Sequence, residues 1–480
     1  MIQDITVTTD PRTASDEKFL IPLAARKLNI APGRVKRVVI ARRSIDARQR
    51  DVKINLALKV YVDELPENVS LCVPERYPAL PADAPQAIIV GAGPAGLFAA
   101  LRLIQLGVKP VILERGKDVD ARRKDMARIA RENFVDPDSN YCFGEGGAGA
   151  FSDGKLYTRS KKRGSIEKIL NIFCQHGASE DILRDAHPHI GTDRLPGVIK
   201  AIRLTIEGAG GEIRFGTRVE RLIISDGRVE GVIDAAGNEY RGPVILATGH
   251  SARDVYRMLN ASGVTLDPKG LAIGVRLEHP QHLIDCLRYH SRDGRGKYLP
   301  AAEYTMLTRV DDRAVYSFCM CPGGFIIPAA SADGQLVVNG MSPSNRGTRW
   351  ANSGMVVEIL PEDVPGDSPL KMMDYQESIE RAFWEEAGKT QNSPAQRMDD
   401  FVNSRPSASL PDTSYAPGIH PARMDKLLPP FIAGRLQQGF RDFDRKNRGF
   451  LTNEAVLIGA ETRTSSPVRI PRDEISLAHI

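Results

Sequence analysis

The first 62 residues alternate apolar and polar positions in the manner of a small α+β unit. Every second residue from Ile54 to Val62 is apolar, which is the period of a half-buried strand. Shorter apolar segments predict two further strands at residues 5–8 and 35–42. A 3.6-residue period predicts a helix over 16–28, although Pro22 falls inside it. We therefore expect a small N-terminal α+β domain over residues 1–62.

The pattern changes character beyond this unit. Residues 63–86 carry five prolines, at positions 66, 74, 78, 81 and 85, which predicts a linker. Strand and helix patterns then alternate through residues 87–270, as in an α/β domain. Several short strands over 271–400 predict a second, β-rich α+β domain inserted into the first. We expect residues 401–480 to return to the α/β domain.

The strongest motif lies at the start of the α/β region. The apolar residues 88–90 predict a buried strand, and Gly91, Gly93 and Gly96 follow it at GxGxxG spacing. The first glycine allows a tight turn, the second leaves room for a pyrophosphate, and the third lets the helix pack on the strand. Pro94 and Ala95 open a helix whose free N–H groups would face the phosphates. The fold class is therefore α/β with a Rossmann-like domain.

The residues that follow complete a βαβ unit. Residues 111–113 predict the second strand, and Glu114 stands 23 residues after Gly91, where a carboxylate can accept hydrogen bonds from ribose hydroxyls. A second GxGxxG at residues 144–149 follows polar residues and opens no amphipathic helix, so we do not interpret it as another Rossmann turn. A single such turn binds FAD or NAD. Glu114-Arg115-Gly116, the later glycine-rich loop and Ala247-Thr248-Gly249 together favour FAD.

Composition and charge narrow the class of protein. The 480-residue chain is 42% hydrophobic and 26% charged, which excludes wholesale disorder and a membrane bundle. Its net charge of +5 is too small to indicate nucleic-acid binding by itself. Six cysteines without a CxxC pair argue against a disulfide framework or a zinc ribbon, and we predict no metal site. No secretory signal or membrane span is visible, so we expect a cytoplasmic protein.

With these residues in hand, the chain resembles a family of bacterial FAD-dependent dehydrogenases of unassigned substrate, of the two-dinucleotide-fold flavoprotein type. The matching segments are RRSIDAR at 42–48, GAGPAGLFAA at 91–100, NYCFGEGGAGAFSDGKL at 140–156, PHIGTD at 188–193, ATGHSARD at 247–254, GVRLEHP at 274–280, CMCPGGF at 319–325, NGMS at 339–342 and ETRTSSPVRI at 461–470. The resemblance implies an FAD domain and a substrate domain inserted into it.

The resemblance also implies roles for individual residues. The residues that it implies for FAD binding are Gly91, Gly93, Pro94, Ala95, Gly96, Glu114, Arg115, Gly146, Gly147, Gly149, Val219, Thr248 and Gly249. Within this set, the glycines at 146–149 would approach the flavin or pyrophosphate, and Val219 would meet the adenine edge. In such flavoproteins a further strand and a glycine-rich turn usually follow the ETRTSSP-like segment. The sequence stops at Ile480, so we expect it to be C-terminally incomplete.

Several side chains are candidates for chemistry beside a flavin. His250 follows the Ala-Thr-Gly turn and is the best-placed general acid or base, with capping of the next helix as the alternative. His189 and His279 are weaker candidates. Arg276 and Arg346 could receive an anionic substrate, or else form surface ion pairs.

Cys319 and Cys321 form a CxC pair. Strand alternation would place both side chains on one face, where we expect two small core residues rather than a redox dithiol.

The sequence as a whole predicts an FAD-dependent oxidoreductase acting on a small molecule, with NAD(P)H as a candidate transient electron donor. The substrate would lie between the FAD domain and the 271–360 sheet. Two alternatives remain. Ten Lys/Arg over residues 26–53 could dock RNA for a modifying flavoprotein, although no aromatic residue is interleaved there and a nucleic-acid partner is not expected. The protein could also bind FAD without catalysis, as a sensor. The oligomeric state is left open.

Overall fold

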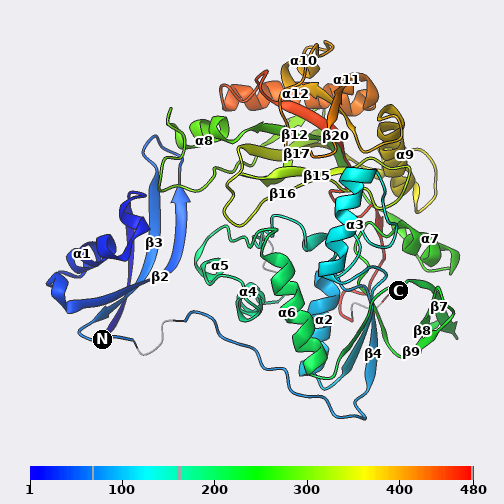
Figure 1. The fold of residues 1–480 in the computed structure, drawn as a ribbon, viewed down its shortest axis with the longest axis horizontal. Helices are drawn as coiled ribbons and strands as arrows, with labels where there is room; N and C mark the ends of the chain where they lie inside the picture. The colour runs from blue at the N-terminus through cyan, green and yellow to red at the C-terminus, as the bar shows by residue number, and fades with distance from the viewer. Residues whose placement is uncertain (67–69, 159–163, 477–478, 480) are drawn as a thin grey trace.

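The computed structural model describes residues 1–66, 70–158, 164–476 and 479. The N-terminal domain stands apart at one side of the molecule (Figure 1). Its elements are β1 (Ile2–Thr9), η1 (Thr13–Ser15), α1 (Glu17–Leu28), η2 (Pro32–Arg34), β2 (Val35–Asp46) and β3 (Lys53–Val62). The strands form an antiparallel sheet in the order β1-β3-β2, and α1 packs its buried Leu20, Ala24 and Ala25 on one face. The strands and the helix predicted for this region are confirmed.

The described residues of the proline-rich segment, 63–66 and 70–85, follow an extended path between this domain and the next one (Figure 1). Its described part forms no helix or strand. It is held along the way by backbone and side-chain hydrogen bonds, such as Leu80 N–H to the Ala209 carbonyl at 2.9 Å and Val73 N–H to the Asn171 side chain at 2.7 Å. The linker therefore lies against the second domain.

The second domain contains a parallel four-stranded sheet in the order β10-β4-β5-β6. Its strands and helices are β4 (Gln86–Val90), α2 (Pro94–Gln105), β5 (Lys109–Leu113), α3 (Val119–Glu132), α4 (Ile166–Gln175), α5 (Asp181–Arg184), α6 (Leu195–Gly208), β6 (Glu212–Arg214), β10 (Val244–Leu246) and α7 (Arg253–Ala261). The predicted meander forms a separate sheet of β7 (Val219–Ser225), β8 (Arg228–Asp234) and β9 (Glu239–Arg241). The helices α2 and α6 lie side by side against the parallel sheet, and α3 packs against α6 (Figure 1).

A second large sheet has seven strands in the order β13-β14-β17-β12-β20-β18-β19. The elements of this region are β11 (Asp267–Pro268), β12 (Leu271–Pro280), α8 (Gln281–Tyr289), β13 (Leu307–Val310), β14 (Arg313–Cys321), β15 (Phe325–Pro328), β16 (Val338–Met341), β17 (Trp350–Ile359), η4 (Pro361–Asp363), α9 (Lys371–Glu386), β18 (Ser393–Arg397), α10 (Met398–Val402), β19 (Ile419–Pro421), α11 (Met424–Leu427), α12 (Pro430–Lys446), β20 (Val456–Glu461) and β21 (Val468–Arg469). Helices α10, α11 and α12 cover its outer face (Figure 1).

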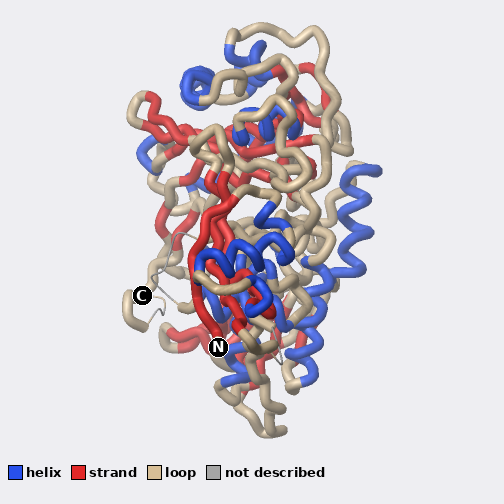
Figure 2. The backbone as a smooth tube through the Cα atoms, turned by 90° about the vertical axis from the view of Figure 1, so that its left-hand side faces the viewer, coloured by secondary structure: helices blue, strands red, loops and turns tan. Residues whose placement is uncertain are grey.

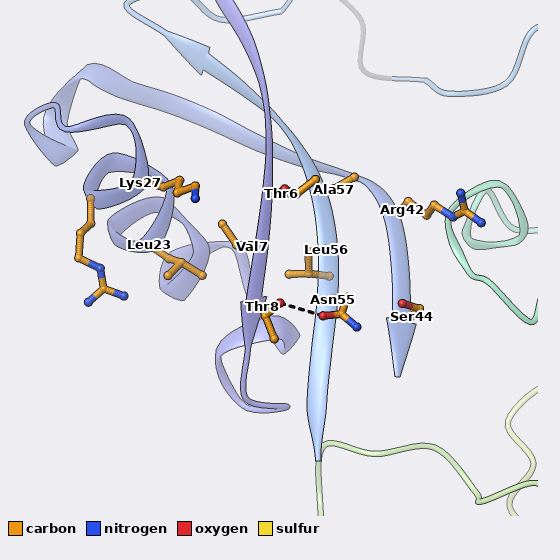
Figure 3. Close-up of a pocket in the computed structure, with 11 residues that line it drawn as sticks. Thr6, Val7, Thr8, Leu23, Lys27, Arg42, Ser44, Asn55, Leu56 and Ala57 are labelled. Carbon is orange, nitrogen blue, oxygen red and sulfur yellow. Dashed lines mark hydrogen bonds between the residues drawn. The ribbon is translucent and has the colours of Figure 1, made fainter. Parts of the chain in front are cut away.

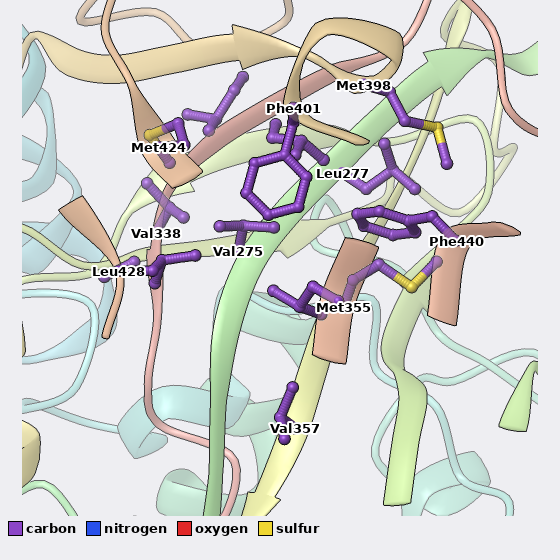
Figure 4. Packing of buried hydrophobic residues seen from close by; sticks show 14 of the residues in the cluster. Val275, Leu277, Val338, Met355, Val357, Met398, Phe401, Met424, Leu428 and Phe440 are labelled. Carbon is purple, nitrogen blue, oxygen red and sulfur yellow. The ribbon is translucent and has the colours of Figure 1, made fainter. Parts of the chain in front are cut away.

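The core between these helices and the sheet is large and apolar. Phe401 of α10 and Phe440 of α12 pack over Val275 and Met355 of the sheet (Figure 4), and each of these side chains is fully buried. Figure 1 and Figure 2 show the two sheet-containing parts one above the other in the vertical direction that both views share. The predicted mixed α/β class is confirmed.

The seven-stranded sheet crosses the domain boundary predicted at residue 400. Strand β20 (Val456–Glu461) hydrogen-bonds to β12 on one side and to β18 on the other, so it is an interior strand of this sheet. The prediction that 401–480 returns to the α/β domain was wrong for this strand. Because an apolar run shows only that a strand is buried, it does not indicate which sheet the strand joins.

Candidate cofactor site

A cavity of about 410 Å³ lies at the carboxyl ends of β4 and β10. Strand β4 has β5 on one side and β10 on the other, and the chain leaves β4 toward β5 through α2. The strand order therefore reverses at β4. In open parallel sheets, ligands bind at such a point, in the crevice outside the carboxyl ends of the strands.

Most of the residues predicted for the site line this one cavity. The predicted residues that line it are Gly91, Gly93, Pro94, Ala95, Glu114, Arg115, Gly147, Gly149, Val219, Thr248, Gly249 and His250. They come from turns that are far apart in the sequence, at residues 91–95, 114–115, 147–149, 219 and 248–250. The structure thus brings together segments that the sequence singled out separately.

The turn after β4 explains two of the glycines in different ways. Gly91 has φ +106°, and a Cβ there would lie 2.7 Å from the Ala247 carbonyl oxygen, so the backbone itself requires glycine. Gly93 has φ −72° and ψ −177°, which any residue can adopt. A Cβ on Gly93 would meet nothing closer than Gly147 Cα at 3.9 Å. The fold therefore does not require glycine at position 93. The absence of a side chain there keeps the cavity open.

Two predicted residues, Gly96 and Gly146, lie behind the cavity wall. A Cβ on Gly96 would lie 2.0 Å from the Gly91 carbonyl oxygen, so this glycine lets α2 pack against the turn. Gly146 has φ +79° and packs against Ile199, and its N–H donates to the Ala92 carbonyl at 2.8 Å. Both residues shape the two glycine-rich turns and fix them to each other.

Glu114 is buried and supports the site through the backbone. Its Oε2 accepts a hydrogen bond from Ala92 N–H at 2.7 Å, and its Oε1 accepts from Gly116 N–H at 2.9 Å and Gly144 N–H at 3.0 Å. A carboxylate has about four acceptor positions, so one remains for a ribose hydroxyl. Sequence reasoning anticipated the ribose but not that Glu114 ties three turns of the cavity together.

Arg115 is held beside the cavity by acidic partners. It contacts Asp138 at 2.8 Å and Asp254 at 2.9 Å, and its guanidinium lies 4.5 Å from the centre of the Phe143 ring. Arg218 also lines the cavity and contacts Asp138 at 3.1 Å. Sequence reasoning missed Arg218 and also Phe143, although Phe143 directly precedes the glycine-rich loop at 144–149.

The glycine-rich loop at residues 144–149 forms no second Rossmann unit, as expected. Only a short 3-10 turn, η3 (Gly147–Gly149), forms there. Gly147 and Gly149 instead face the Pro94 ring. A Cβ on Gly147 would lie 3.6 Å from Pro94 Cδ, and a Cβ on Gly149 would lie 3.2 Å from Pro94 Cγ. The glycines of the two turns thus build a narrow cradle that added side chains would fill. A helix start and this cradle fit the pyrophosphate of a dinucleotide.

Comparisons with known proteins agree with this geometry. A family described as "FAD-dependent protein, C-terminal domain-like" matches residues 270–464, and an FAD binding domain matches residues 85–126. A domain of unknown function matches residues 1–61. An uncharacterized protein of Clostridium beijerinckii is 39% identical over 471 residues, covering 93% of this chain and 87% of that relative. The chain belongs to this family of FAD-dependent proteins. Its cofactor is FAD.

Similarity to solved structures is weak. The tetracycline destructase Tet(51) is 13% identical with a TM-score of 0.29, covering 64% of this chain and 65% of that one. CtdE in complex with FAD is 12% identical with a TM-score of 0.28, covering 79% and 72%. A 3-ketosteroid dehydrogenase from Rhodococcus jostii is 15% identical with a TM-score of 0.26, covering 51% and 69%. At such TM-scores these similarities carry no argument about this FAD-dependent protein.

His250 lines the FAD cavity. Burial lowers its pKa to about 4, and the nearby Arg463 acts in the same direction, so the imidazole is neutral at neutral pH. The following helix α7 has Ala252 as its N-cap residue and no capping side chain. The capping role considered for His250 is therefore not what the structure shows.

The other polar candidates are held by protein partners. His279 is fully buried and hydrogen-bonds to the Phe450 carbonyl at 2.8 Å, and His189 hydrogen-bonds to the Ser344 carbonyl at 3.0 Å. Arg346 is buried against Asp153 at 2.8 Å. Arg276 is completely buried and contacts Glu461 at 3.1 Å, so it is not a surface ion-pair residue.

A buried ionic cluster joins the FAD cavity to the second sheet. Glu380 of α9 has no exposed surface and accepts two hydrogen bonds of 2.8 Å from Arg253, the first residue of α7. It also accepts from Arg463 at 3.2 and 3.3 Å. Arg463 in turn contacts the sulfur of Cys142, which lines the cavity, at 3.3 Å. The sequence did not indicate this cluster.

The expectation for the CxC pair was wrong. Cys319 is exposed whereas Cys321 is completely buried, so the two side chains do not share one face. The reason is a β-bulge: the pairing of β14 with β17 shifts between Phe318 and Cys321, and Cys319 has φ +45°. A bulge inserts an unpaired residue and breaks the two-residue alternation that the prediction assumed.

A larger cavity of about 690 Å³ lies in the N-terminal domain (Figure 3). Thr6, Thr8, Asn55 and Ser44 line it, and Thr8 donates a hydrogen bond of 2.8 Å to Asn55. Arg42 also lines it. It contains none of the residues predicted for the cofactor.

Several basic residues of the N-terminal domain already have acidic partners. Arg34 pairs with Asp63 at 2.6 Å, and Arg43 with Asp185 at 2.7 Å. Arg43 thereby links the N-terminal domain to α5. Among the described residues, no helix has the length and apolar character needed to span a membrane.

Proposed function

We propose that this protein is a cytoplasmic FAD-dependent oxidoreductase that acts on a small molecule, with NAD(P)H as its transient electron donor. The observation that carries the proposal is the cavity at the end of β4, where Gly93 leaves space that the fold itself does not need. FAD supplies two-electron chemistry when bound, and the protein supplies binding, orientation and electrostatics.

The residues of the cavity divide this work. The N-terminus of α2, behind Gly93 and Pro94, would present free N–H groups to the pyrophosphate. The remaining acceptor position of Glu114 suits a ribose hydroxyl, and Val219 lies where the adenine is expected. The Thr248-Gly249 turn closes the opposite wall.

The substrate is proposed to enter where the cavity meets the second sheet. Cys142 lines the cavity, and its sulfur lies 3.8 Å from the Ala329 carbonyl oxygen and 3.3 Å from Arg463. Those partners follow β15 and β20 of the second region. Because this wall belongs to residues outside the FAD-binding motif, it is where substrate specificity would arise. The pairing of Arg34 and Arg43 with carboxylates favours a small molecule over nucleic acid.

The first test is the cofactor and its reduction. We expect the purified protein to show a flavin absorption spectrum, and the released cofactor to be FAD. Under anaerobic conditions, NADH or NADPH should bleach that spectrum in stopped-flow measurements. Bound FAD that neither donor reduces would favour the non-catalytic alternative, and a gel shift with RNA at low salt would favour the RNA-modifying one.

His250 is proposed as the proton acceptor of the reaction. With a pKa of about 4 it is neutral above roughly pH 5, so the rate of flavin reduction should stay level down to that pH and fall as the pH drops through 4. His250→Asn should keep FAD bound but lower turnover by about 100-fold or more, within the usual range for general acid–base catalysis. The exposed His282→Gln is the control and should behave as the wild type. An unchanged rate in His250→Asn would remove the role.

A further inference from the structure

At the bulge in β14, Cys319 is exposed to solvent and Cys321 is buried in the core. Cys319 is exposed and has the left-handed φ of +45°, which is strained for a residue with a Cβ. Cys321, two residues later, is completely buried, and its sulfur lies 3.4 Å from the Cys319 carbonyl oxygen. Strained backbone of this kind persists only where its surroundings hold it, and it gathers at functional sites.

Two cations from separate segments hold this bulge. Arg276 of β12 donates to the Cys319 carbonyl at 2.7 Å and lies 3.4 Å from the Cys321 sulfur. Arg276 itself is completely buried and anchored to Asn352 at 2.9 Å. Lys155, from the loop after η3, donates its ammonium to the Met320 carbonyl between the two cysteines. Asp153 pairs with Lys155 at 3.3 Å and Glu461 pairs with Arg276 at 3.1 Å, so these carboxylates offset part of the positive charge. The two cations are nevertheless the groups that contact the bulge directly, which favours a thiolate.

The electrostatics distinguish the two sulfurs. A hydrogen bond from the Cys321 thiol lowers the pKa of Cys319, and Lys155 and Arg276 lower it further. Partial desolvation of the sulfur by the surrounding protein atoms and the charge of Asp153 act in the opposite direction. The same hydrogen bond and burial raise the pKa of Cys321. One accessible thiolate next to one buried thiol is the arrangement of an attacking and a resolving cysteine.

Cys72, Cys174 and Cys286 lack this arrangement, and Cys142, although it contacts Arg463 at 3.3 Å, belongs to no CxC pair. Burial raises the pKa of Cys72, and it raises the pKa of Cys174 to about 12. Cys286 lies on α8, where its sulfur is 3.4 Å from the His282 ring, and the structure places it away from the FAD cavity. The loop that carries Lys155, by contrast, also carries Gly149 of the cavity wall, six residues earlier. The dithiol therefore contacts the same loop that lines the cofactor site.

We propose that Cys319 and Cys321 form a dithiol centre that reduces low-molecular-weight disulfides. The Cys319 thiolate attacks one sulfur of the substrate disulfide, a mixed disulfide forms, and the first substrate thiolate leaves. The Cys321 sulfur then attacks Cys319, the intramolecular disulfide forms, and the second substrate sulfur leaves with the proton of Cys321 as a thiol. The dithiol loses two electrons and the substrate disulfide gains them, so the step balances without another reactant.

The test is a single-turnover reaction of the reduced protein with 5,5′-dithiobis(2-nitrobenzoate), followed by absorbance and intact mass. We expect a fast phase that releases two thionitrobenzoate equivalents per chain and leaves no adduct, because the protein loses only two hydrogen atoms. The fast phase should persist at pH 6, where an ordinary thiol with a pKa of about 8.5 reacts hundreds of times more slowly. Peptide mapping should place the new disulfide between Cys319 and Cys321.

Variants separate the two cysteines and the cation. Cys321→Ser should release one equivalent and retain a stable adduct on Cys319, and Cys319→Ser should lose the fast phase. Lys155→Met should slow the fast phase at pH 6 by about tenfold, because the thiolate loses its neighbouring charge. Cys286→Ser should react as the wild type.

A stable adduct on Cys319 in the wild type would overturn the proposal, since it would show a reactive thiol without a resolving partner. A fast phase that maps to other cysteines would overturn it as well. Because the wild-type reaction alone gives these readings, the proposal remains testable if a variant fails to fold. The reaction is measured by thionitrobenzoate release and by the mass of the cysteine-containing peptides. A negative result is therefore distinct from a failure to bind or reduce flavin.

Discussion

Replacing Gly93 with valine is expected to abolish FAD binding while the protein stays folded. The backbone at Gly93 is extended, with φ −72° and ψ −177°, so valine adopts it without strain. The nearest protein atom to a Cβ there is 3.9 Å away, so the fold accepts the first carbon of the new side chain. The side chain would therefore enter the cavity between the Gly91–Ala95 turn and η3.

The expected effect is a loss of at least 100-fold in FAD affinity, which corresponds to about 3 kcal/mol. In the proposed site, the pyrophosphate contacts the backbone N–H groups at the start of α2. A branched side chain at position 93 would keep the pyrophosphate away from these N–H groups. The measurements are the FAD content of the purified variant and the dissociation constant from a flavin fluorescence titration. Circular dichroism reports whether the fold is kept.

The matched control is Gly197→Val. Gly197 is also exposed to open space, with no atom within 4 Å of its Cβ position, but it lies on α6, away from the cavity. Valine has a higher helix propensity than glycine, so this variant should be as stable as the wild type or slightly more so. Full FAD content in Gly93→Val would show that the phosphates do not lie at this turn.

The local parts of the site followed directly from the sequence. A buried strand, the spacing of Gly91, Gly93 and Gly96, and the second strand before Glu114 are constraints that neighbouring residues place on one another. The helix and strand positions in this unit agree with the structure for the same reason. The glycines at 91, 93 and 96 are required by the turn, the cofactor space and the helix packing respectively, so the pattern can be recognised within one short segment.

The remaining features depend on contacts between distant segments. The bulge that separates Cys319 from Cys321 is held by Arg276, which lies 43 residues earlier. No local sequence pattern indicates that Arg276 contacts this bulge. Strict strand alternation therefore placed the Cys319 side chain on the wrong face. The sheet to which β20 belongs was mispredicted for a related reason, because an apolar strand can join either sheet. The sequence likewise did not indicate that Glu380 pairs with Arg253 and Arg463, which lie 127 and 83 residues away from it.

Glu380→Ala is expected to destabilise the whole protein. Removing this carboxylate takes away the ion-pair partner of the buried Arg463 guanidinium and leaves the buried Arg253 with the more distant Glu377, at 3.8 Å. Breaking a buried ion pair in this way costs about 3–5 kcal/mol, a large part of the 5–15 kcal/mol that stabilises a typical protein. Because Arg463 also contacts Cys142 in the cavity wall, FAD content should fall with stability. Thermal unfolding and flavin content measure the two effects.

The same cluster predicts sensitivity to acid. Burial would raise the pKa of Glu380, but Arg463 and Arg253 outweigh it and hold the pKa at about 2, below the 4.5 of a free glutamate. A group whose pKa is lower in the folded protein stabilises it fully above the unfolded pKa. That contribution, about 3 kcal/mol, is lost as the pH falls from 4.5 toward 2. Wild-type unfolding monitored by urea at successive pH values should show this decline, and the Glu380→Gln variant should show less of it.

Glu385→Ala is the control on the same helix. Glu385 lies in the last turn of α9 and is exposed, so its removal should change the free energy of unfolding by no more than about 0.5 kcal/mol. If Glu380→Ala unfolds at the temperature of the wild type and keeps its flavin, then Arg253 and Arg463 find other partners or water, and the cluster does not hold the cavity to the second sheet. A loss of stability with unchanged flavin content would instead confine the role of Glu380 to packing between α7, α9 and β20.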